Sequence, residues 1–321
     1  MVIGVSAGRG GKEPPALRDA KVLVTGGAGF IGSHTTDALL RAGAGVVVVD
    51  NLSTGRRQNL NPDATFYEVN IADESFGEIL TRERPDVIYH FAFYVLVPKS
   101  VEDPLLDMDA LIGSIRFLNY ARRHGVRKIV CASSGFLYGN APTLPVPETA
   151  PIDPVSPYVV AKQAVEGYLR FFSRAYGLPY VILRYSAVYG PRQSTGAMAD
   201  YIRKLSSGQQ ADIWGDGMKT RDYVYVDDVV SANLLALAVP ADHPDPVFNI
   251  GTGTETTLNA LYRSIAAHLG AEASPVYHPD RPGEQIRYCL DHTRATREMG
   301  WAPKVSLEEG LRLTVRAHRG G

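Results

Sequence analysis

The feature that most constrains this chain is a glycine-rich turn between a short apolar run and a helical pattern. Lys21–Thr25 is apolar and β-branched, and Gly26, Gly29 and Gly32 follow it at GxxGxxG spacing. Glycine permits a tight turn and lets the backbone approach a pyrophosphate, which the free N–H groups of a following helix then bind. A helical stretch does follow, from about Ile31 to Ala42. Strand, turn and helix in this order predict a dinucleotide-binding unit.

The next predicted strand ends in a carboxylate. Val46–Asp50 is a buried-strand pattern, and Asp50 comes 18 residues after Gly32. A carboxylate at this place accepts both hydroxyls of the adenosine ribose and repels a 2′-phosphate. We therefore expect NAD rather than NADP as the cofactor, with Arg56 and Arg57 as the nearby residues that would weaken this preference.

Strand-like and helical patterns then alternate along the first half of the chain. Further strands are expected at Thr65–Val69, Val87–Phe91, Lys128–Ala132 and Tyr180–Leu183, and long helices at Leu105–His124 and Pro157–Tyr176. Alternation of this kind predicts an α/β fold with a doubly wound parallel sheet of the Rossmann type, covered by helices on both faces.

The regular alternation of strand and helix patterns ends after about Arg184, where shorter elements and glycine-containing loops begin. We expect residues 1–19 to form a loosely packed N-terminal tail and residues 20–183 to form the NAD-binding domain, completed by about 222–252. Residues 184–221 and 253–321 are expected to form a smaller C-terminal lobe that binds the substrate.

Composition excludes several classes of function. The chain is 45% hydrophobic and 21% charged, with a formal net charge of -1, so neither a nucleic acid nor a membrane surface is an expected partner. No apolar run approaches the ~18 residues that span a bilayer, and no leader pattern is evident, so we expect a cytoplasmic protein. Cys131 and Cys289 lack CxxC spacing, which predicts neither a disulfide nor a metal site.

A tyrosine and a lysine at YxxxK spacing are the candidate catalytic pair. Ser156 is a good helix N-cap and Pro157 suits the first helical position, so Tyr158 and Lys162 should lie one turn apart on one helix face. A lysine cation and a cationic nicotinamide would both lower the pKa of the phenol and make it a usable base. Ser134 follows a predicted strand and is placed to bind a substrate hydroxyl, whereas its neighbour Ser133 is the better candidate for a purely structural role.

Taken together, these motifs resemble the extended short-chain dehydrogenase/reductase family, the NAD-dependent epimerases and dehydratases. The resemblance runs from about Lys21 to Val315 and is nearest to the UDP-glucose 4-epimerases. It is carried by the glycine turn, Asp50 and the SPYxxxK segment, and by Tyr138-Gly139, Tyr189-Gly190-Pro191-Arg192, Gly215-Asp216-Gly217 and Arg221-Asp222-Tyr223.

The resemblance implies a role for each of these residues. Tyr158 would take the proton of the sugar 4-hydroxyl, Lys162 would bind the nicotinamide ribose, and Ser134 would help move the proton. NAD would remain bound through every cycle. The residues that the resemblance and the motifs place against NAD are Gly26, Gly29, Phe30, Ile31, Gly32, Asp50, Asn51, Ser53, Gly55, Asn70, Ile71, Phe91, Ala92, Tyr158 and Lys162.

The predicted substrate is a nucleotide-diphosphate sugar, most simply a UDP-sugar. Arg221 and Arg281 are the candidate cations for the diphosphate, since the planar guanidinium suits it. The resemblance places Glu284 against the ribose and Tyr288 on the pocket wall, where a bulky side chain implies little space beside the sugar C2 substituent. It also implies a homodimer formed through the helices expected at Leu105–His124 and Pro157–Tyr176.

Several positions depart from the family pattern. Phe93 and Tyr94 are aromatic where small or amide side chains are usual, Ala110 and Ala187 replace asparagines, and Asn70 replaces an aspartate. The alternatives that remain are a UDP-glucuronate 4-epimerase, a 4,6-dehydratase, a UDP-glucuronate decarboxylase and a non-catalytic NAD sensor. A dehydratase or decarboxylase needs acidic groups after the serine, where this chain has Gly135-Phe136-Leu137.

Overall fold

A seven-stranded parallel sheet forms the centre of the molecule. The computed structural model describes residues 17–18, 20–93, 97–272, 274–281 and 285–320. Within them the strand order is β11-β6-β5-β4-β1-β2-β3, and every pairing in this sheet is parallel. The strands are β1 (Lys21–Thr25), β2 (Gly45–Asp50), β3 (Thr65–Glu68), β4 (Val87–His90), β5 (Lys128–Ser134), β6 (Tyr180–Tyr185) and β11 (Val247–Ile250). The order reverses beside β1, so the predicted doubly wound fold is confirmed.

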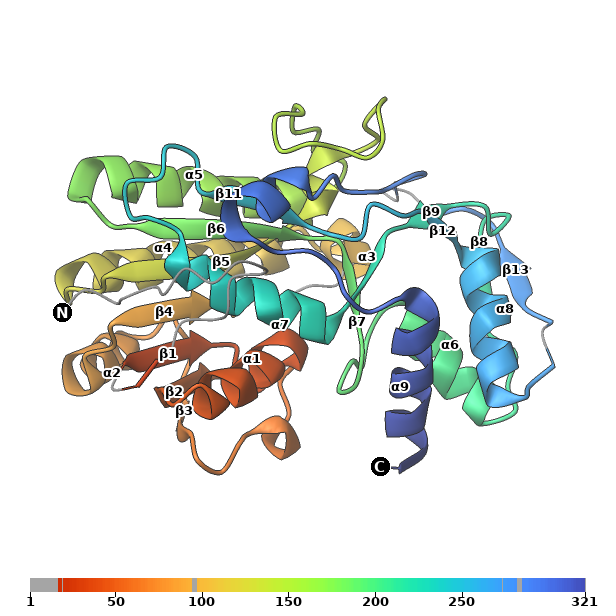
Figure 1. Ribbon diagram of the computed structural model, residues 1–321, viewed down its shortest axis with the longest axis horizontal. Coiled ribbons are helices and arrows are strands. Elements are labelled where there is room, and N and C mark those ends of the chain that lie inside the picture. Colours follow the sequence, from red (N-terminus) through yellow and green to blue (C-terminus); the bar gives the residue numbers. More distant parts are fainter. Residues whose placement is uncertain (1–16, 19, 94–96, 273, 282–284, 321) are drawn as a thin grey trace.

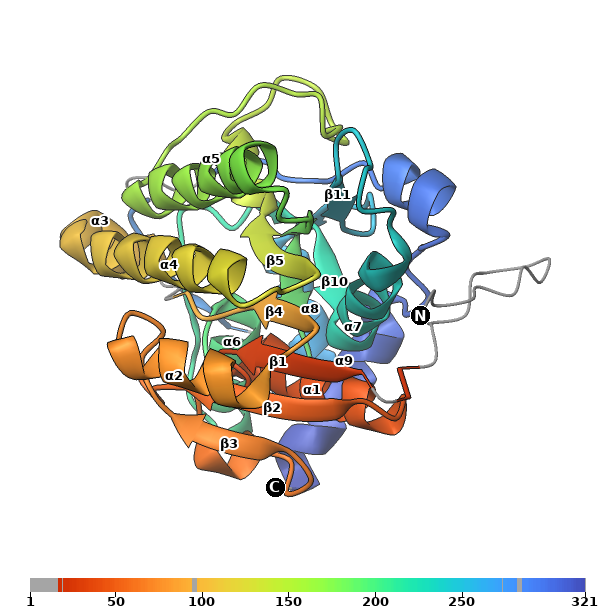
Figure 2. The same cartoon turned by 90° about the vertical axis from the view of Figure 1, so that its left-hand side faces the viewer.

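Helices cover both faces of this sheet (Figure 2). One face carries α1 (Phe30–Arg41) and α7 (Val226–Leu235), and the other carries α2 (Glu74–Glu83), α4 (Leu105–Arg123) and α5 (Pro157–Tyr176). The short helix α3 (Val97–Glu102) precedes α4. Successive strand residues point to opposite faces, so each strand contributes to both of the resulting cores.

The alternation is visible along β1. Val22 and Val24 pack in the core beneath α1 and α7, whereas Leu23 packs in the core beneath α2, α4 and α5. All three side chains are fully buried. A strand buried on both faces needs apolar residues at every position, which is why β1 and β2 are continuous apolar runs rather than alternating ones.

A smaller lobe lies beside one end of the sheet, at the right of Figure 1. It contains α6 (Ala197–Ser206), α8 (Leu258–Leu269) and α9 (Leu307–Gly320). The remaining described strands form three two-stranded sheets: β7 (Ala187–Tyr189) with β10 (Tyr223–Tyr225), β9 (Thr220–Arg221) with β12 (Thr256–Thr257), and β8 (Asp212–Trp214) with β13 (Val276–His278). Single helical turns occur at Arg57–Asn59, Gly135–Tyr138, Ala236–Ala238 and Ala295–Met299.

The structure differs from the sequence-based boundaries at several places. Leu17, assigned above to a loosely packed tail, is buried in the core, and its N–H donates to the carbonyl oxygen of Ala42 at 3.2 Å. Strand β5 continues to Ser134 and strand β6 to Tyr185, because these ends pair with each other. Among the described residues, every helix is too short or too polar to cross a membrane.

Candidate active site

The glycine turn after β1 has the close backbone approach that its sequence predicts. Gly26 has a φ of 71°, and a Cβ there would come within 2.8 Å of the backbone N of Ala92. A Cβ on Gly32 would lie 2.2 Å from the carbonyl oxygen of Gly26. A Cβ on Gly29, the N-cap of α1, would meet only that same oxygen, at 3.1 Å. The turn is therefore closed against the protein and open above the helix N-terminus, where a diphosphate fits.

Asp50 lies at the end of β2, next to this turn. Its carboxylate accepts hydrogen bonds from the backbone N–H groups of Ala28 at 3.0 Å and Leu52 at 2.8 Å. Burial raises the pKa of Asp50, and these two donors only partly oppose the rise. Gly55 passes close by, since a Cβ there would come within 2.8 Å of Oδ1. Hydroxyl groups of a ribose would add donors to this buried carboxylate, so the residues present fit the adenosine end of NAD.

The other predicted cofactor residues follow the strands on the same edge of the sheet. Phe30 and Ile31 form the first residues of α1, and the remainder lie after β2, β3 and β4. Several are held by local hydrogen bonds: Asn51 Oδ1 accepts from Ser53 N at 3.1 Å, and Asn70 Oδ1 accepts from Ala72 N at 3.0 Å. Ile71 is buried. These residues are Asn51, Ser53, Gly55, Asn70, Ile71, Phe91 and Ala92.

Strand β4 brings its loop onto the glycine turn. The backbone N–H of Phe91 donates to the carbonyl oxygen of Thr25 at 3.0 Å, and the N–H of Ala92 donates to Thr25 Oγ1 at 3.3 Å. The carboxyl ends of β1, β2 and β4 thus converge, as expected for the ligand crevice of a doubly wound sheet.

Tyr158 lies in the first turn of α5, beside the end of β5. Its side chain is buried. Burial raises the pKa of Tyr158, its interaction with Ser134 lowers it in part, the charge of Asp107 raises it further, and the net pKa is raised. Ser134 Oγ also accepts from the N–H of Phe136 at 3.1 Å, which fixes the hydroxyl at the turn after β5.

Lys162 lies one helical turn after Tyr158 and is also buried. Its Nζ donates to the carbonyl oxygen of Ala132 at 3.0 Å and lies 4.1 Å from the ring centroid of Phe93. Burial lowers the pKa of Lys162 to about 8. The ammonium group thus contacts Ala132 and Phe93.

The helix start that presents Tyr158 is capped differently from the sequence-based expectation. Ser156 occupies the N-cap position, but its side chain makes no capping hydrogen bond. Ser100 on α3 supplies that bond, because its Oγ accepts from the N–H of Tyr158 at 2.7 Å. The cap is a tertiary contact between α3 and α5, which no local sequence pattern could reveal.

Ser133 points away from the catalytic pair into a buried ion pair. Its Oγ donates to Glu166 at 2.7 Å, and Arg184 donates to both carboxylate oxygens of Glu166. Arg184 also donates to the hydroxyl of Tyr138 at 2.7 Å. Glu166 follows Lys162 by four residues on α5, a spacing that would have indicated its shared helix face.

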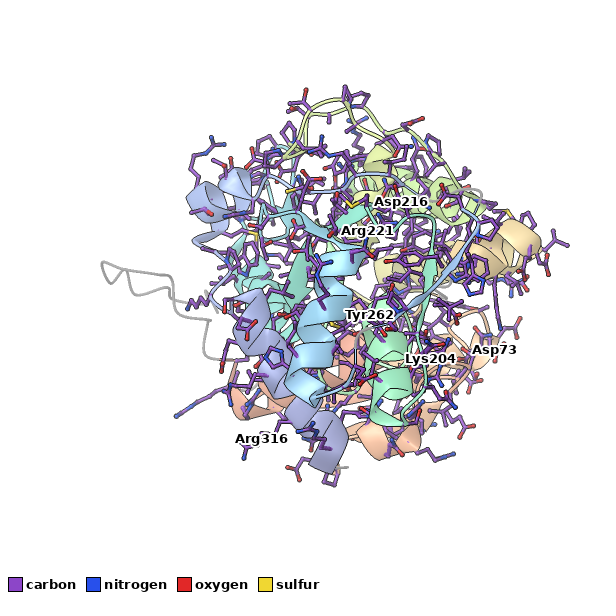
Figure 3. All side chains as sticks on the ribbon, turned by 90° about the vertical axis from the view of Figure 1, so that its right-hand side faces the viewer. Asp73, Lys204, Asp216, Arg221, Tyr262 and Arg316 are labelled. Carbon is purple, nitrogen blue, oxygen red and sulfur yellow. The ribbon has the colours of Figure 1, made fainter. Side chains whose placement is uncertain are left out.

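The nucleotide end of the proposed site lies on the smaller lobe. Arg221 lies on β9 near the first turn of α8 (Figure 3), and its guanidinium is 5.9 Å from the ring centroid of Phe136, next to Ser134. Arg281 stacks on Trp214 at 3.6 Å. Sequence reasoning alone does not identify Trp214, although it directly precedes the Gly215-Asp216-Gly217 motif. Glu284 lies outside the described residues.

Tyr288 lies directly behind the turn that holds Ser134. Its side chain is 2% exposed, its hydroxyl donates to the carbonyl oxygen of Tyr185 at 3.0 Å, and its ring packs against Phe136 at 5.2 Å. A Cβ on Gly135 would lie 2.0 Å from that hydroxyl, so the two positions are sterically linked. The residues described contain no cluster of three potential metal ligands.

Comparison with known proteins identifies the family. The model of the "NAD dependent epimerase/dehydratase family" matches residues 22–251. The chain belongs to this family. A UDP-glucose 4-epimerase of Mycolicibacterium smegmatis is 42% identical over 310 residues, which cover 93% of this chain and 98% of that protein.

Solved structures of the family agree. A UDP-glucose 4-epimerase of Thermotoga maritima, crystallised with UDP-glucose, has a TM-score of 0.90 and 46% identity, with 94% of this chain and 99% of that chain covered. A UDP-glucose 4-epimerase of Thermus thermophilus, in complex with NAD, has a TM-score of 0.88 and 39% identity, again with 94% and 99% covered. The family expected from the motifs is therefore confirmed, and with it an NAD-dependent isomerase.

Proposed function

We propose that the protein is a UDP-glucose 4-epimerase, which interconverts UDP-glucose and UDP-galactose through a transient 4-keto sugar. The observation that carries this proposal is the convergence of Ser134, Tyr158 and Lys162 beside the glycine turn, without an acidic side chain in Gly135-Phe136-Leu137. NAD, held by the glycine turn, Asp50 and Lys162, would supply the hydride acceptor and donor for C4 of the sugar.

The chain's own residues move the proton. Tyr158 accepts the proton of the 4-hydroxyl. Burial raises the pKa of its phenol overall, and the interaction with Ser134 opposes that rise, in the direction that this step requires. Ser134 relays the proton because its hydroxyl both donates and accepts. Lys162, anchored on the Ala132 carbonyl, presents its remaining N–H groups to the nicotinamide ribose. No further acid or base is needed, because epimerisation leaves the C5 and C6 bonds intact.

Arg221 and Arg281 bind the diphosphate in this proposal, and Glu284 contacts the nucleotide ribose. The guanidinium of Arg221 is tethered by its own hydrogen bonds to the carbonyl oxygens of Thr220 at 2.7 Å and Gln285 at 3.0 Å. A tethered guanidinium loses less side-chain entropy when a diphosphate binds. In this proposal the NAD-binding domain comprises residues 20–183 with about 222–252. The substrate-binding lobe comprises residues 184–221 with 253–321.

We also propose a homodimer. Large apolar side chains are exposed along α4 and α5, which pack side by side (Figure 2): Leu105, Leu106, Met108, Ile112, Val160, Tyr168, Phe171 and Tyr176. Exposed apolar surface of this extent on two adjacent helices marks a protein contact. Light scattering at micromolar concentration should give twice the chain mass, and Phe171→Asp should shift it to that of the monomer. A monomeric wild type contradicts the proposal.

The test of the reaction is incubation with a panel of sugars. UDP-glucose, UDP-glucuronate, dTDP-glucose and UDP-N-acetylglucosamine are each incubated with the purified protein, and the products are identified by proton NMR while absorbance at 340 nm follows NADH. We expect UDP-galactose from UDP-glucose with no net NADH. A preference for UDP-glucuronate supports the 4-epimerase of the sugar acid, a 4-keto-6-deoxy product indicates a dehydratase, and no turnover of any sugar indicates a non-catalytic NAD-binding protein.

A further inference from the structure

Phe93 projects from the backbone that closes the glycine turn. It follows Ala92, whose N–H group is the atom that a Cβ on Gly26 would touch. The N–H of Phe93 donates to the carbonyl oxygen of Phe91 at 2.8 Å, which makes a tight turn after β4. The backbone of Phe93 is therefore fixed relative to the dinucleotide turn, whereas its side chain can still change rotamer.

The ring of Phe93 contacts both members of the catalytic pair. Its centroid is 5.9 Å from that of Tyr158 with an interplanar angle of 74°, an edge-to-face contact. The ammonium nitrogen of Lys162 lies 4.1 Å from the same centroid. An ammonium over an aromatic face is attracted by the negative potential of the ring, and the attraction is greatest where water is excluded. Lys162 is 5% exposed, so this condition holds.

Lys162 has few other partners for its charge. Its ammonium group donates a hydrogen bond to the neutral carbonyl of Ala132. The acidic groups that act on it electrostatically, Glu166 and Asp107, are not hydrogen-bonded to it among the described residues. Among the described residues, the ring face of Phe93 and the carbonyl of Ala132 are thus the contacts of the ammonium group. A ribose hydroxyl that accepts a hydrogen bond from Lys162 would have to share the ammonium group with the ring.

We propose that Phe93 is a positioning residue for Lys162 and competes with the nicotinamide ribose for its ammonium group. The inference rests on the proposed function, in which Lys162 binds that ribose. The ring holds Lys162 in place until NAD binds, and rotation of the Phe93 side chain to another rotamer then releases the ammonium to the ribose hydroxyls. The cation–π contact is broken when NAD binds, so it weakens the binding of NAD by its own free energy.

The test is a double-mutant cycle on NAD affinity in the full-length protein. Bound nucleotide is removed with charcoal, folding is checked by circular dichroism, and the dissociation constant for radiolabelled NAD is measured by equilibrium dialysis. Phe93→Ala should tighten binding by about two- to thirtyfold, the range that corresponds to a cation–π contact. Phe93→Leu, which keeps apolar volume without a ring face, should change it in the same direction, and Phe93→Tyr should leave it unchanged.

The Lys162→Met background decides whether the competition is for the ammonium group. There, Phe93→Ala should give no gain, because no cation remains to compete for. An equal gain in both backgrounds means that the ring only fills space and overturns the proposal. Unchanged or weaker NAD binding in Phe93→Ala and Phe93→Leu also overturns it. A wild-type protein that binds no NAD refutes the proposed function instead, so the two failures are distinguishable.

Discussion

The buried pair of Glu166 and Arg184 should be the most sensitive point beneath the catalytic helix. Their side chains are 1% and 3% exposed, and Arg184 NH2 lies 2.7 Å from Glu166 Oε2. Burial by itself raises the pKa of Glu166, but Arg184, Ser133 and Arg170 together outweigh it and the net pKa is lowered. The pair joins α5, which carries Tyr158 and Lys162, to strands β5 and β6.

Glu166→Gln leaves the guanidinium of Arg184 buried without a counter-charge. Removing one partner of such a pair typically costs about 3–5 kcal/mol of unfolding free energy, because the remaining charge is desolvated and unpaired. Arg184 keeps the Tyr138 hydroxyl and the amide oxygen of the new glutamine, so the lower end of this range is expected. The catalytic helix loses its alignment with Ser134 as well, and kcat should fall more than KM rises.

Urea unfolding followed by circular dichroism measures this loss, with NAD held at a fixed saturating concentration. Arg184→Met should cost a similar amount, and the double variant should lose about 2 kcal/mol less than the sum of the two. The matched control is Glu309→Gln, which removes an exposed pair with Arg312 and should not move the midpoint measurably. Additive losses, or a Glu166→Gln variant as stable as the control, would refute the reasoning.

Three further predictions concern the catalytic pair and the pocket wall. Tyr158→Phe should lower kcat by about 10²–10⁴-fold while co-purified NAD stays unchanged, because only the proton acceptor is lost; near-full activity contradicts the mechanism. Burial lowers the pKa of Lys162 from 10.5 to about 8, so folded and unfolded states are both protonated below pH 8 and the full cost of burial is present there. Lys162→Met should therefore raise the free energy of unfolding by up to about 3 kcal/mol at pH 7. This gain should shrink as pH rises from 8 to 10.5, because in that range the unfolded wild type binds more protons than the folded one. A difference between variant and wild type that does not depend on pH would contradict the prediction. Tyr288→Ser should raise kcat/KM for UDP-N-acetylglucosamine relative to UDP-glucose by about tenfold, since it opens space beside C2; an unchanged ratio removes Tyr288 from the selectivity argument.

The parts of the fold that sequence could predict are those set by local pattern. A Cβ would meet backbone atoms at Gly26, Gly29 and Gly32. Because glycine avoids this contact, the spacing of the three glycines alone indicates the turn. The apolar runs of β1 and β2 are buried on both faces of the sheet, so their burial could be predicted from the continuous apolar sequence. The place of Asp50 at the end of β2 was predictable because the apolar run Val46–Val49 leads directly into it.

The parts that sequence missed depend on contacts between distant segments. Ser100 caps α5 from 58 positions away, while Ser156, the local candidate, makes no capping bond. Phe93 was recognised only as a departure from the family pattern, because nothing in the order of residues places its ring on Lys162. The stacking of Arg281 on Trp214 likewise joins two segments that only the folded lobe brings together.

The central claim is that C4 of the sugar is oxidised and then reduced by the same bound cofactor, with Tyr158 as the proton acceptor. UDP-glucose carrying deuterium at C4 tests it most directly, with the product analysed by NMR and mass spectrometry after turnover in ordinary water. The account predicts UDP-galactose that keeps the deuterium at C4, because the hydride returns to the carbon it left. Loss of the deuterium to solvent, or its transfer to C6 in a 4-keto-6-deoxy product, would contradict it.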